Sequence, residues 1–212
     1  MTASLADHRY PHRGGSPRGE GLRGDGLAAD SAHGPGPAPS LHKRLAPLRL
    51  VPQPEGLLQI YTAPFRGSVG SVFSQALRSA GLGSRVLVCQ CLKGGVDQGT
   101  AGALSLCGRL RWLRPDTPQC LDTPAAIAGS QACAAVAEIW ESGREQLLAG
   151  TLDLVVFDEL GLAMELGYLA ANEVTDTLAR RPPHVDVILT GPSMPSELMA
   201  MADQVTQLRR GL

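Results

Sequence analysis

The sequence is poor in lysine and in aromatic residues. Its 212 residues include two lysines, Lys43 and Lys93, against seventeen arginines, and Phe, Trp and Tyr together make up 4% of the chain. The formal net charge is −1. A protein that captures nucleic acid through its surface charge needs a clear excess of cations. We therefore expect no nucleic-acid partner.

The sequence also lacks an apolar run long enough to span a membrane and lacks a signal-peptide pattern. These two absences lead us to expect a soluble, cytoplasmic protein with no membrane partner. Hydrophobic residues still make up 43% of the chain, which is enough for one well-packed core. One domain is the default for this length.

Metal-binding cysteine patterns are missing as well. The chain has five cysteines, no C-x-x-C motif and no paired histidines, so a structural zinc site is not expected. The odd count favours reduced thiols. Cys89 and Cys91 alternate with apolar residues in a predicted strand, where cysteine usually serves as a small hydrophobic residue.

The first part of the chain differs in composition from the rest. Residues 1–56 contain eight of the sixteen prolines and four of the five histidines, with no apolar periodicity. We predict that residues 1–55 form a disordered leader and that residues 56–212 form the folded domain. The scattered histidines lack the spacing of a metal site, which favours a solvated tail over a metal-binding tract.

Short apolar runs alternate with amphipathic helical patterns from Gly56 onward, which predicts an α/β fold with a mostly parallel sheet and helices on both faces. The predicted strands are Leu57–Thr62, Ser84–Leu92, Leu110–Leu113, Leu152–Glu159, Val185–Thr190 and Val205–Arg210. The first predicted helix begins near Val69 and ends at Ala80. Three further helices are predicted at Ala125–Leu148, Glu173–Arg181 and Pro195–Ala202.

The turn between the first strand and the first helix has the layout of a phosphate-binding P-loop. Gly67 and Gly70 allow the backbone to close around a phosphate, and the helix that follows offers free N–H groups. The residue expected to be lysine is Ser68, and the position of the Mg²⁺-binding hydroxyl is Val69. Arg66 is the nearest cation in the sequence.

Two later strands end in polar residues. The strand Leu152–Glu159 closes on Asp158 and Glu159, the Walker B arrangement, in which Asp holds the Mg²⁺ shell and Glu orients a nucleophile. Acids at a strand end also serve solubility, but the P-loop-like turn favours the functional interpretation. Lys93 and Gly94 follow the second strand, either as a ligand contact or as an ordinary turn. Because strands with these motifs are neighbours in P-loop sheets, we expect both acids to face the same cleft as Arg66.

These motifs together resemble one family, the P-loop type of ATP:cob(I)alamin (corrinoid) adenosyltransferase. The resemblance covers residues 56–210 and rests on blocks in a fixed order, namely Arg66-Gly67, Gln90-x-Leu-Lys93-Gly94, Gly99, Trp140, Leu152–Leu160, Ile188–Gly191 and Ala202–Leu208. It implies a six-stranded, mostly parallel P-loop NTPase-like sheet, a homodimer, and transfer of the 5′-deoxyadenosyl group of ATP to a Co(I) corrinoid in cobalamin biosynthesis or salvage.

The resemblance also implies roles for individual residues. It places ATP on Thr62, Arg66, Gly67, Ser68, Gly70, Ser71 and Lys93, Mg²⁺ on Asp158, and a catalytic role on Glu159. The sequence departs from the family at the loop, where Ala63–Gly70 stands for Gly-x-Gly-Lys-Gly-Lys-Thr-Thr. It departs again where Asp122 and Pro124 replace an aromatic pair and Thr100 replaces an acid.

Two functions are compatible with this pattern. The first is a corrinoid adenosyltransferase in which Arg66 and the nearby serines replace the lost lysine and threonine contacts. The second is a non-catalytic interaction or regulatory protein built on the same scaffold. Each lost charge-assisted contact weakens binding by roughly ten- to a hundredfold, so the departures leave the second hypothesis open.

Overall fold

The computed structural model describes residues 55–67, 69–95, 98–125 and 130–209. The predicted leader lies outside the described residues except for Glu55, so its disorder stays a prediction. Among the described residues, no helix is both long and apolar enough to cross a membrane.

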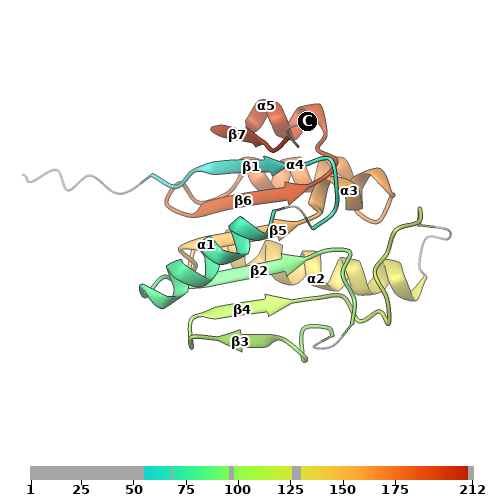
Figure 1. The fold of residues 1–212 in the computed structure, drawn as a ribbon, viewed down its shortest axis with the longest axis horizontal. Helices are drawn as coiled ribbons and strands as arrows, with labels where there is room; N and C mark the ends of the chain where they lie inside the picture. Colours follow the sequence, from blue (N-terminus) through green and yellow to red (C-terminus); the bar gives the residue numbers. More distant parts are fainter. Residues whose placement is uncertain (1–54, 68, 96–97, 126–129, 210–212) are drawn as a thin grey trace, which may run out of the picture. The chain divides into compact units, whose positions relative to one another are not determined.

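The described chain forms one sheet with helices on both sides (Figure 1). The strands are β1 (Leu58–Thr62), β2 (Val86–Gln90), β3 (Leu104–Leu106), β4 (Leu110–Leu113), β5 (Leu154–Asp158), β6 (Asp186–Gly191) and β7 (Gln204–Gln207). The helices are α1 (Gly70–Gly81), α2 (Gln131–Leu148), α3 (Leu160–Glu165), α4 (Ala171–Ala179) and α5 (Ser196–Met201).

The strand order is β3-β4-β2-β5-β6-β1-β7, and every neighbouring pair is parallel except β3 with β4. The predicted α/β fold with a mostly parallel sheet is therefore confirmed, and each predicted strand and helix is present with shifted ends. The sheet has seven strands instead of the six that the resemblance implied. The added strand is β3, an edge strand of three residues, which is too short to show a periodic apolar pattern.

One expected neighbour relation is wrong. The strand with the P-loop-like turn, β1, does not lie beside β5, because β6 pairs with both of them and separates them. The order of elements along the chain does not determine which strands become neighbours in a sheet with long crossovers. The carboxyl ends of β1, β5 and β6 nevertheless lie on the same edge, because all three strands are parallel.

The central strands are buried on both faces. Every residue of β2 (Val-Leu-Val-Cys-Gln) and of β5 (Leu-Val-Val-Phe-Asp) is buried, as is typical of a parallel sheet covered by helices on both sides. Both runs are apolar until their last residue. The pairing register then places Gln90 opposite Asp158 at the carboxyl edge of the sheet.

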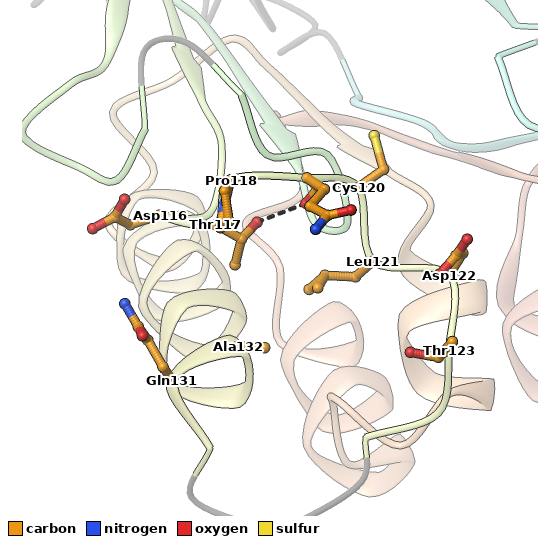
Figure 2. A pocket seen from close by; sticks show the side chains of 10 residues that line it. Asp116, Thr117, Pro118, Cys120, Leu121, Asp122, Thr123, Gln131 and Ala132 are labelled. Carbon is orange, nitrogen blue, oxygen red and sulfur yellow. Dashed lines mark hydrogen bonds between the residues drawn. The ribbon is translucent and has the colours of Figure 1, made fainter.

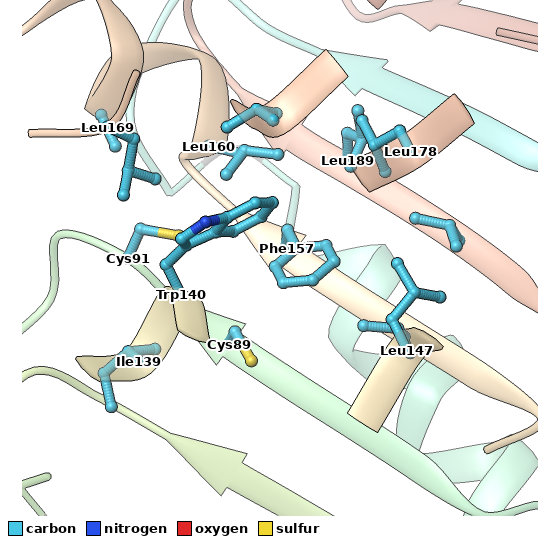
Figure 3. Close-up of a cluster of buried hydrophobic side chains, with 14 of the residues drawn as sticks. Cys89, Cys91, Ile139, Trp140, Leu147, Phe157, Leu160, Leu169, Leu178 and Leu189 are labelled. Carbon is cyan, nitrogen blue, oxygen red and sulfur yellow. The ribbon is translucent and has the colours of Figure 1, made fainter. Parts of the chain in front are cut away.

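The two faces of the sheet have separate cores. α1 packs on one face through Val72, Ala76 and Ala80, and the other face is covered by α2 and the later helices. Figure 3 shows the second core, where the Trp140 and Phe157 rings lie 5.4 Å apart beside Cys89. The expected burial of Cys89 and Cys91 is confirmed, and desolvation raises the pKa of Cys89 to about 12.

Gly143 allows α2 to lie close to β5. A Cβ atom at this position would lie 2.7 Å from Cε1 of Phe157 and 3.0 Å from Sγ of Cys89. Neither neighbour has room to move, since both are fully buried in the sheet core. The small residue therefore fixes the spacing between the helix and the sheet.

We predict that Gly143→Ala destabilises the fold by about 1–2 kcal/mol. Overpacking costs about 1–3 kcal/mol, and the better helix propensity of alanine returns up to about 1 kcal/mol. Gly81→Ala is the matched control, because no atom lies within 4 Å of a Cβ built there. Urea denaturation of both variants measures the difference. Equal stability of the two variants would contradict the packing role of Gly143.

Candidate active site

An ion pair joins the P-loop-like turn to the end of β5. Arg66 donates from Nε to Oε1 of Glu159 at 2.7 Å and from Nη2 to Oε2 at 2.6 Å. The remaining terminal nitrogen, Nη1, donates to the carbonyl oxygen of Leu121 at 2.9 Å. The Glu159 side chain is 2% exposed and that of Arg66 28% exposed. This bidentate geometry is the strongest form of arginine–carboxylate pairing.

Glu159 has a backbone conformation that few non-glycine residues adopt. It lies at φ 61° between β5 and α3, and its N–H donates to the carbonyl of Thr190 at 2.7 Å. A Cβ at Gly191 would lie 3.2 Å from its Cα, so glycine there permits the close approach of β6. Unusual backbone conformations of this kind persist where surrounding contacts hold them, and they cluster at functional sites.

Asp158 is buried beside this ion pair but points into a different set of contacts. Its Oδ1 accepts from Oγ1 of Thr190 at 2.6 Å and its Oδ2 accepts from Nε2 of Gln90 at 2.8 Å. Burial raises the pKa of Asp158, while these two hydrogen bonds and the charge of Lys93 oppose that rise. The hydrogen bonds compensate part of the cost of burying the carboxylate.

The amide of Gln90 has a single orientation in this network. Its Oε1 accepts from Nε1 of Trp112 and from Nε of Arg114, each at 2.9 Å. Both partners are donors only, so the oxygen must face them and the NH₂ group must face Asp158. Residues of β2 and β4 therefore help to position the carboxylate at the end of β5.

The turn between β1 and α1 combines a glycine of positive φ with the start of a helix. Gly67 has φ 78°, and α1 begins at Gly70 after Val69, whose side chain makes no capping hydrogen bond. Gly70 and Ser71 are exposed at this helix start, whereas Val69 is only 3% exposed and packs in the core under α1. Ser68 lies outside the described residues. Uncapped N–H groups at a helix N-terminus favour an anion.

Thr62 and Lys93 lie on the same edge of the sheet and are not members of the Arg66–Glu159 ion pair. Thr62 lines a small hollow of about 210 Å³ between the ends of β1, β6 and β7. Lys93 follows β2 in a loop that packs on the chain near Thr117. A Cβ at Gly94 would lie 2.0 Å from the Thr117 carbonyl oxygen, so Gly94 has a packing role whatever the role of Lys93.

A larger pocket, of about 370 Å³, includes in its lining Leu121, whose carbonyl accepts from Arg66. Figure 2 shows the side chains that line this pocket. The pocket lies between the loop after β4 and the start of α2, and its lining includes Asp116, Cys120, Asp122 and Gln131. Through Leu121, the pocket borders the ion pair directly.

The sequence predicted that both acids face the same cleft as Arg66. Glu159 contacts Arg66, whereas Asp158 points toward Gln90 and Thr190. The structure brings Arg66 and Glu159 into direct contact and holds Asp158 in the adjoining network. Sequence reasoning did not assign Gln90, Thr190, Trp112, Arg114 or Leu121 to the site. A polar residue ending an otherwise apolar run was the available signal for Gln90 and Thr190, while the carbonyl of Leu121 leaves no signal in the sequence.

The fold and site define an α/β protein of the P-loop NTPase-like class with a modified loop. Residues 54–211 match the family described as ATP:corrinoid adenosyltransferase BtuR/CobO/CobP. The chain belongs to this family.

Individual relatives agree. The corrinoid adenosyltransferase CobA of Salmonella typhimurium is 32% identical over 154 residues, which cover 73% of this chain and 76% of that protein. The corrinoid adenosyltransferase of Escherichia coli strain K12 is 30% identical over the same shares, and that of Pseudomonas aeruginosa is 26% identical over 163 residues, 72% of this chain and 74% of that protein.

The side chains around Asp158 supply only part of the set of oxygen ligands that Mg²⁺ requires. Both of its oxygens already accept a hydrogen bond, and Glu159 is held by Arg66. Within the described ranges, no group of three or more His, Cys, Asp or Glu side chains is placed to hold a metal. Mg²⁺ at nucleotide sites is usually bound by one or two carboxylates together with substrate phosphates, so Asp158 fits as a single protein ligand.

We predict that Arg66→Met lowers the free energy of unfolding by about 3 kcal/mol, because it leaves the buried Glu159 carboxylate without its partner. The double variant Arg66→Met/Glu159→Gln should be more stable than Arg66→Met alone, since the amide removes the uncompensated charge. Denaturant unfolding of the two single variants and the double variant measures this coupling.

Arg144→Met is the control for this cycle. It breaks the pair with Glu141 on the surface of α2, and an exposed pair contributes little. If Glu159→Gln changed the free energy of unfolding equally with and without Arg66, the two side chains would not be coupled. That result would contradict a stabilising role for the ion pair.

Proposed function

We propose that this chain transfers the 5′-deoxyadenosyl group of ATP to a Co(I) corrinoid at the carboxyl edge of its sheet. The cobalt attacks C5′ of the nucleotide, the bond between C5′ and the triphosphate oxygen breaks, and the electron pair leaves with triphosphate. Cobalt is thereby oxidised from Co(I) to Co(III) as the Co–C bond forms. Membership of the adenosyltransferase family favours this activity over a non-catalytic role on the same scaffold.

The observation that carries the proposal is the contact between Arg66 and Glu159. It joins the anion-binding turn, the end of β5 and the pocket wall at Leu121 into one unit. ATP phosphates placed at the start of α1 would therefore lie close to a molecule held in the neighbouring pocket. Co(I) is itself a strong nucleophile, so the main contribution of the protein to catalysis is to hold the two reactants together in a fixed geometry.

Each residue of the site has a proposed task. The backbone around Gly67, Gly70 and Ser71 binds the phosphates, with Ser68 and Lys93 as further contacts. Arg66 positions Glu159 and balances its charge, and Thr62 lies beside the loop. The carboxylates of Asp116 and Asp122 suit the amide N–H groups that surround a corrinoid ring.

Two further parts of the proposal concern Mg²⁺ and assembly. Mg²⁺ would be held by Asp158 together with ATP phosphates, where it would balance charge on the leaving triphosphate. The active form would be a homodimer, as the family resemblance implies.

Reduction of the corrinoid to Co(I) must precede the transfer, so a one-electron reductase reaction has to supply this substrate.

An anaerobic transfer assay tests the function. The full chain, MgATP and chemically reduced cob(I)alamin should give a product with a photolabile Co–C bond and one triphosphate per product, both measured after separation. A variant with Glu159→Gln should retain less than a tenth of this rate, because the bidentate ion pair that holds Arg66 and its turn in position is then lost. Failure of the unmodified chain to form any adenosylcorrinoid, under conditions where a family relative turns over, would favour the non-catalytic role.

We also predict that the unmodified chain binds MgATP weakly, at high micromolar to millimolar Kd. Helix-terminus N–H groups contribute only about 0.3–1 kcal/mol each, and Val69 offers no oxygen to Mg²⁺. The change Ser68→Lys with Val69→Thr should tighten binding at least tenfold, since it adds a charge at the β/γ-phosphates and a hydroxyl for the metal. Calorimetric titration with MgATP measures both values.

Gln75→Lys provides the matched control for this experiment, because it adds a lysine at an exposed position of α1 outside the turn. Low-micromolar affinity of the unmodified chain would show that the loop uses other contacts.

A further inference from the structure

The end of the sheet opposite the proposed active site carries a second pocket of different character. Its volume is about 430 Å³, and it lies at the amino ends of β2 and β4 and beside the chain that follows α2. The lining contains three arginines, Arg85, Arg109 and Arg111, and no acidic residue. We call it the basic pocket. The pocket next to Arg66 is lined instead by two aspartates and no cation.

The hairpin formed by β3 and β4 builds one wall of the basic pocket. Cys107 and Gly108 turn the chain at φ 53° and φ 66°, and the N–H of Arg109 closes the turn on the Leu106 carbonyl at 3.2 Å. Two consecutive residues with positive φ form the tight turn that matches the twist of paired strands. Ser105 lies opposite Arg111 in the antiparallel register, so both side chains stand on the face that α2 covers.

The three arginines differ in how far their charge is balanced. Arg85 pairs with Asp153 through Nη2 to Oδ1 at 2.8 Å and Nε to Oδ2 at 3.2 Å, and this pairing holds the pKa of Asp153 at about 2. Arg111 has only a long contact of 3.5 Å to the neutral Gln146. The side chain of Arg109 makes no hydrogen bond or ion pair in the described part of the chain, but its charge helps to lower the pKa of Asp153. Asp153 therefore balances Arg85 directly and Arg109 at longer range, while Arg111 has no acidic partner within hydrogen-bond distance in the described part of the chain.

The remaining lining suits a small organic anion. Val86 and Leu110 belong to the lining, although their side chains are buried in the core under α1, while Ser105 and Thr151 add hydroxyl groups to the lining. The volume lies within the range of small-molecule sites, about 300–1,000 Å³. Arginine binds phosphate and carboxylate through two parallel N–H groups, which makes it the preferred residue for such ligands.

We propose that the basic pocket binds a small molecule bearing a phosphate or carboxylate group, and that Arg109 and Arg111 are its principal contacts. This site is independent of adenosyl transfer, because it lies at the amino ends of β2 and β4, on the edge of the parallel strands opposite the edge that carries Arg66, Asp158 and Glu159. It is open at the surface, so a ligand can enter without any movement of the sheet. The proposal does not depend on whether the chain is an active transferase.

A purely structural role for these arginines is the competing explanation. α2 ends at Leu148 with no basic residue in its last turn, and cations near a helix C-terminus stabilise its carbonyl groups. Arg109 and Arg111 on the neighbouring hairpin could serve that purpose. The two explanations differ in their consequences, since only the first requires saturable anion binding.

The test is titration of the full ¹⁵N-labelled chain with inorganic phosphate and, separately, with citrate, while the arginine Nε–H signals are recorded by NMR. We expect the Arg109 and Arg111 signals to shift saturably with at least one of the two anions, at a Kd below about 1 mM. The double variant Arg109→Gln/Arg111→Gln should bind that anion at least tenfold more weakly, because two charge-assisted contacts are lost. Response to phosphate alone or to citrate alone identifies the ligand chemistry.

Arg78→Gln on α1 is the matched control, because it removes an exposed arginine from the opposite face of the sheet. It should change the affinity less than twofold, and the transfer assay should be unaffected in both variants. Equal anion affinity in the double variant and the control, or the absence of a saturable shift, would overturn the proposal. A lower melting temperature of the double variant with unchanged anion binding would assign the arginines to α2 and would also overturn it.

Discussion

The pairing of Arg66 with Glu159 is the constraint around which the carboxyl edge of the sheet is built. Glu159 is almost fully buried, and an uncompensated carboxylate there would be expensive. Arg66 supplies the compensation from a turn that follows a different strand, and it reaches across the intervening end of β6 to do so. The turn, the left-handed residue at the end of β5 and the pocket wall at Leu121 are therefore held in one arrangement.

The neighbouring Asp158 is controlled by different means. Its environment contains neutral donors, Gln90 and Thr190, and the nearby charge of Lys93. The orientation of Gln90 is in turn determined by two donors from β4 and the residue after it. Buried polar networks are favourable only when each member is satisfied, and this one leaves the carboxylate with a partner on each oxygen. The two adjacent acids thus have separate supports, one ionic and one built from neutral groups.

Much of this architecture could be predicted from the sequence. The apolar runs of β2 and β5 identified buried parallel strands, and the polar residues that end β5 identified the functional edge. Strand order could not be predicted, because the sequence does not show that the chain crosses over to place β6 between β1 and β5. α3 was missed because it follows Glu159 immediately and is six residues long, too short to show a helical period. The partners of Arg66 include a backbone carbonyl, and such contacts leave no trace in side-chain patterns.

The Arg66–Glu159 ion pair limits how strongly this edge of the sheet would attract an anionic substrate. Arg66 is balanced by Glu159, and Lys93 lies near enough to Asp158 for its charge to favour the ionised carboxylate. Arg66 is therefore not available as a full positive charge to a triphosphate, whereas Lys93 makes no ion pair in the described part of the chain. The remaining attraction comes from the uncapped N–H groups at the start of α1 and from any metal bound with the nucleotide. Weak attraction in the ground state is compatible with catalysis, since only interactions that strengthen as charge develops on the leaving group accelerate the reaction. An ion pair that shifts toward the departing triphosphate would supply such an interaction, because Arg66 could then exchange part of its bond with Glu159 for a bond with the leaving group.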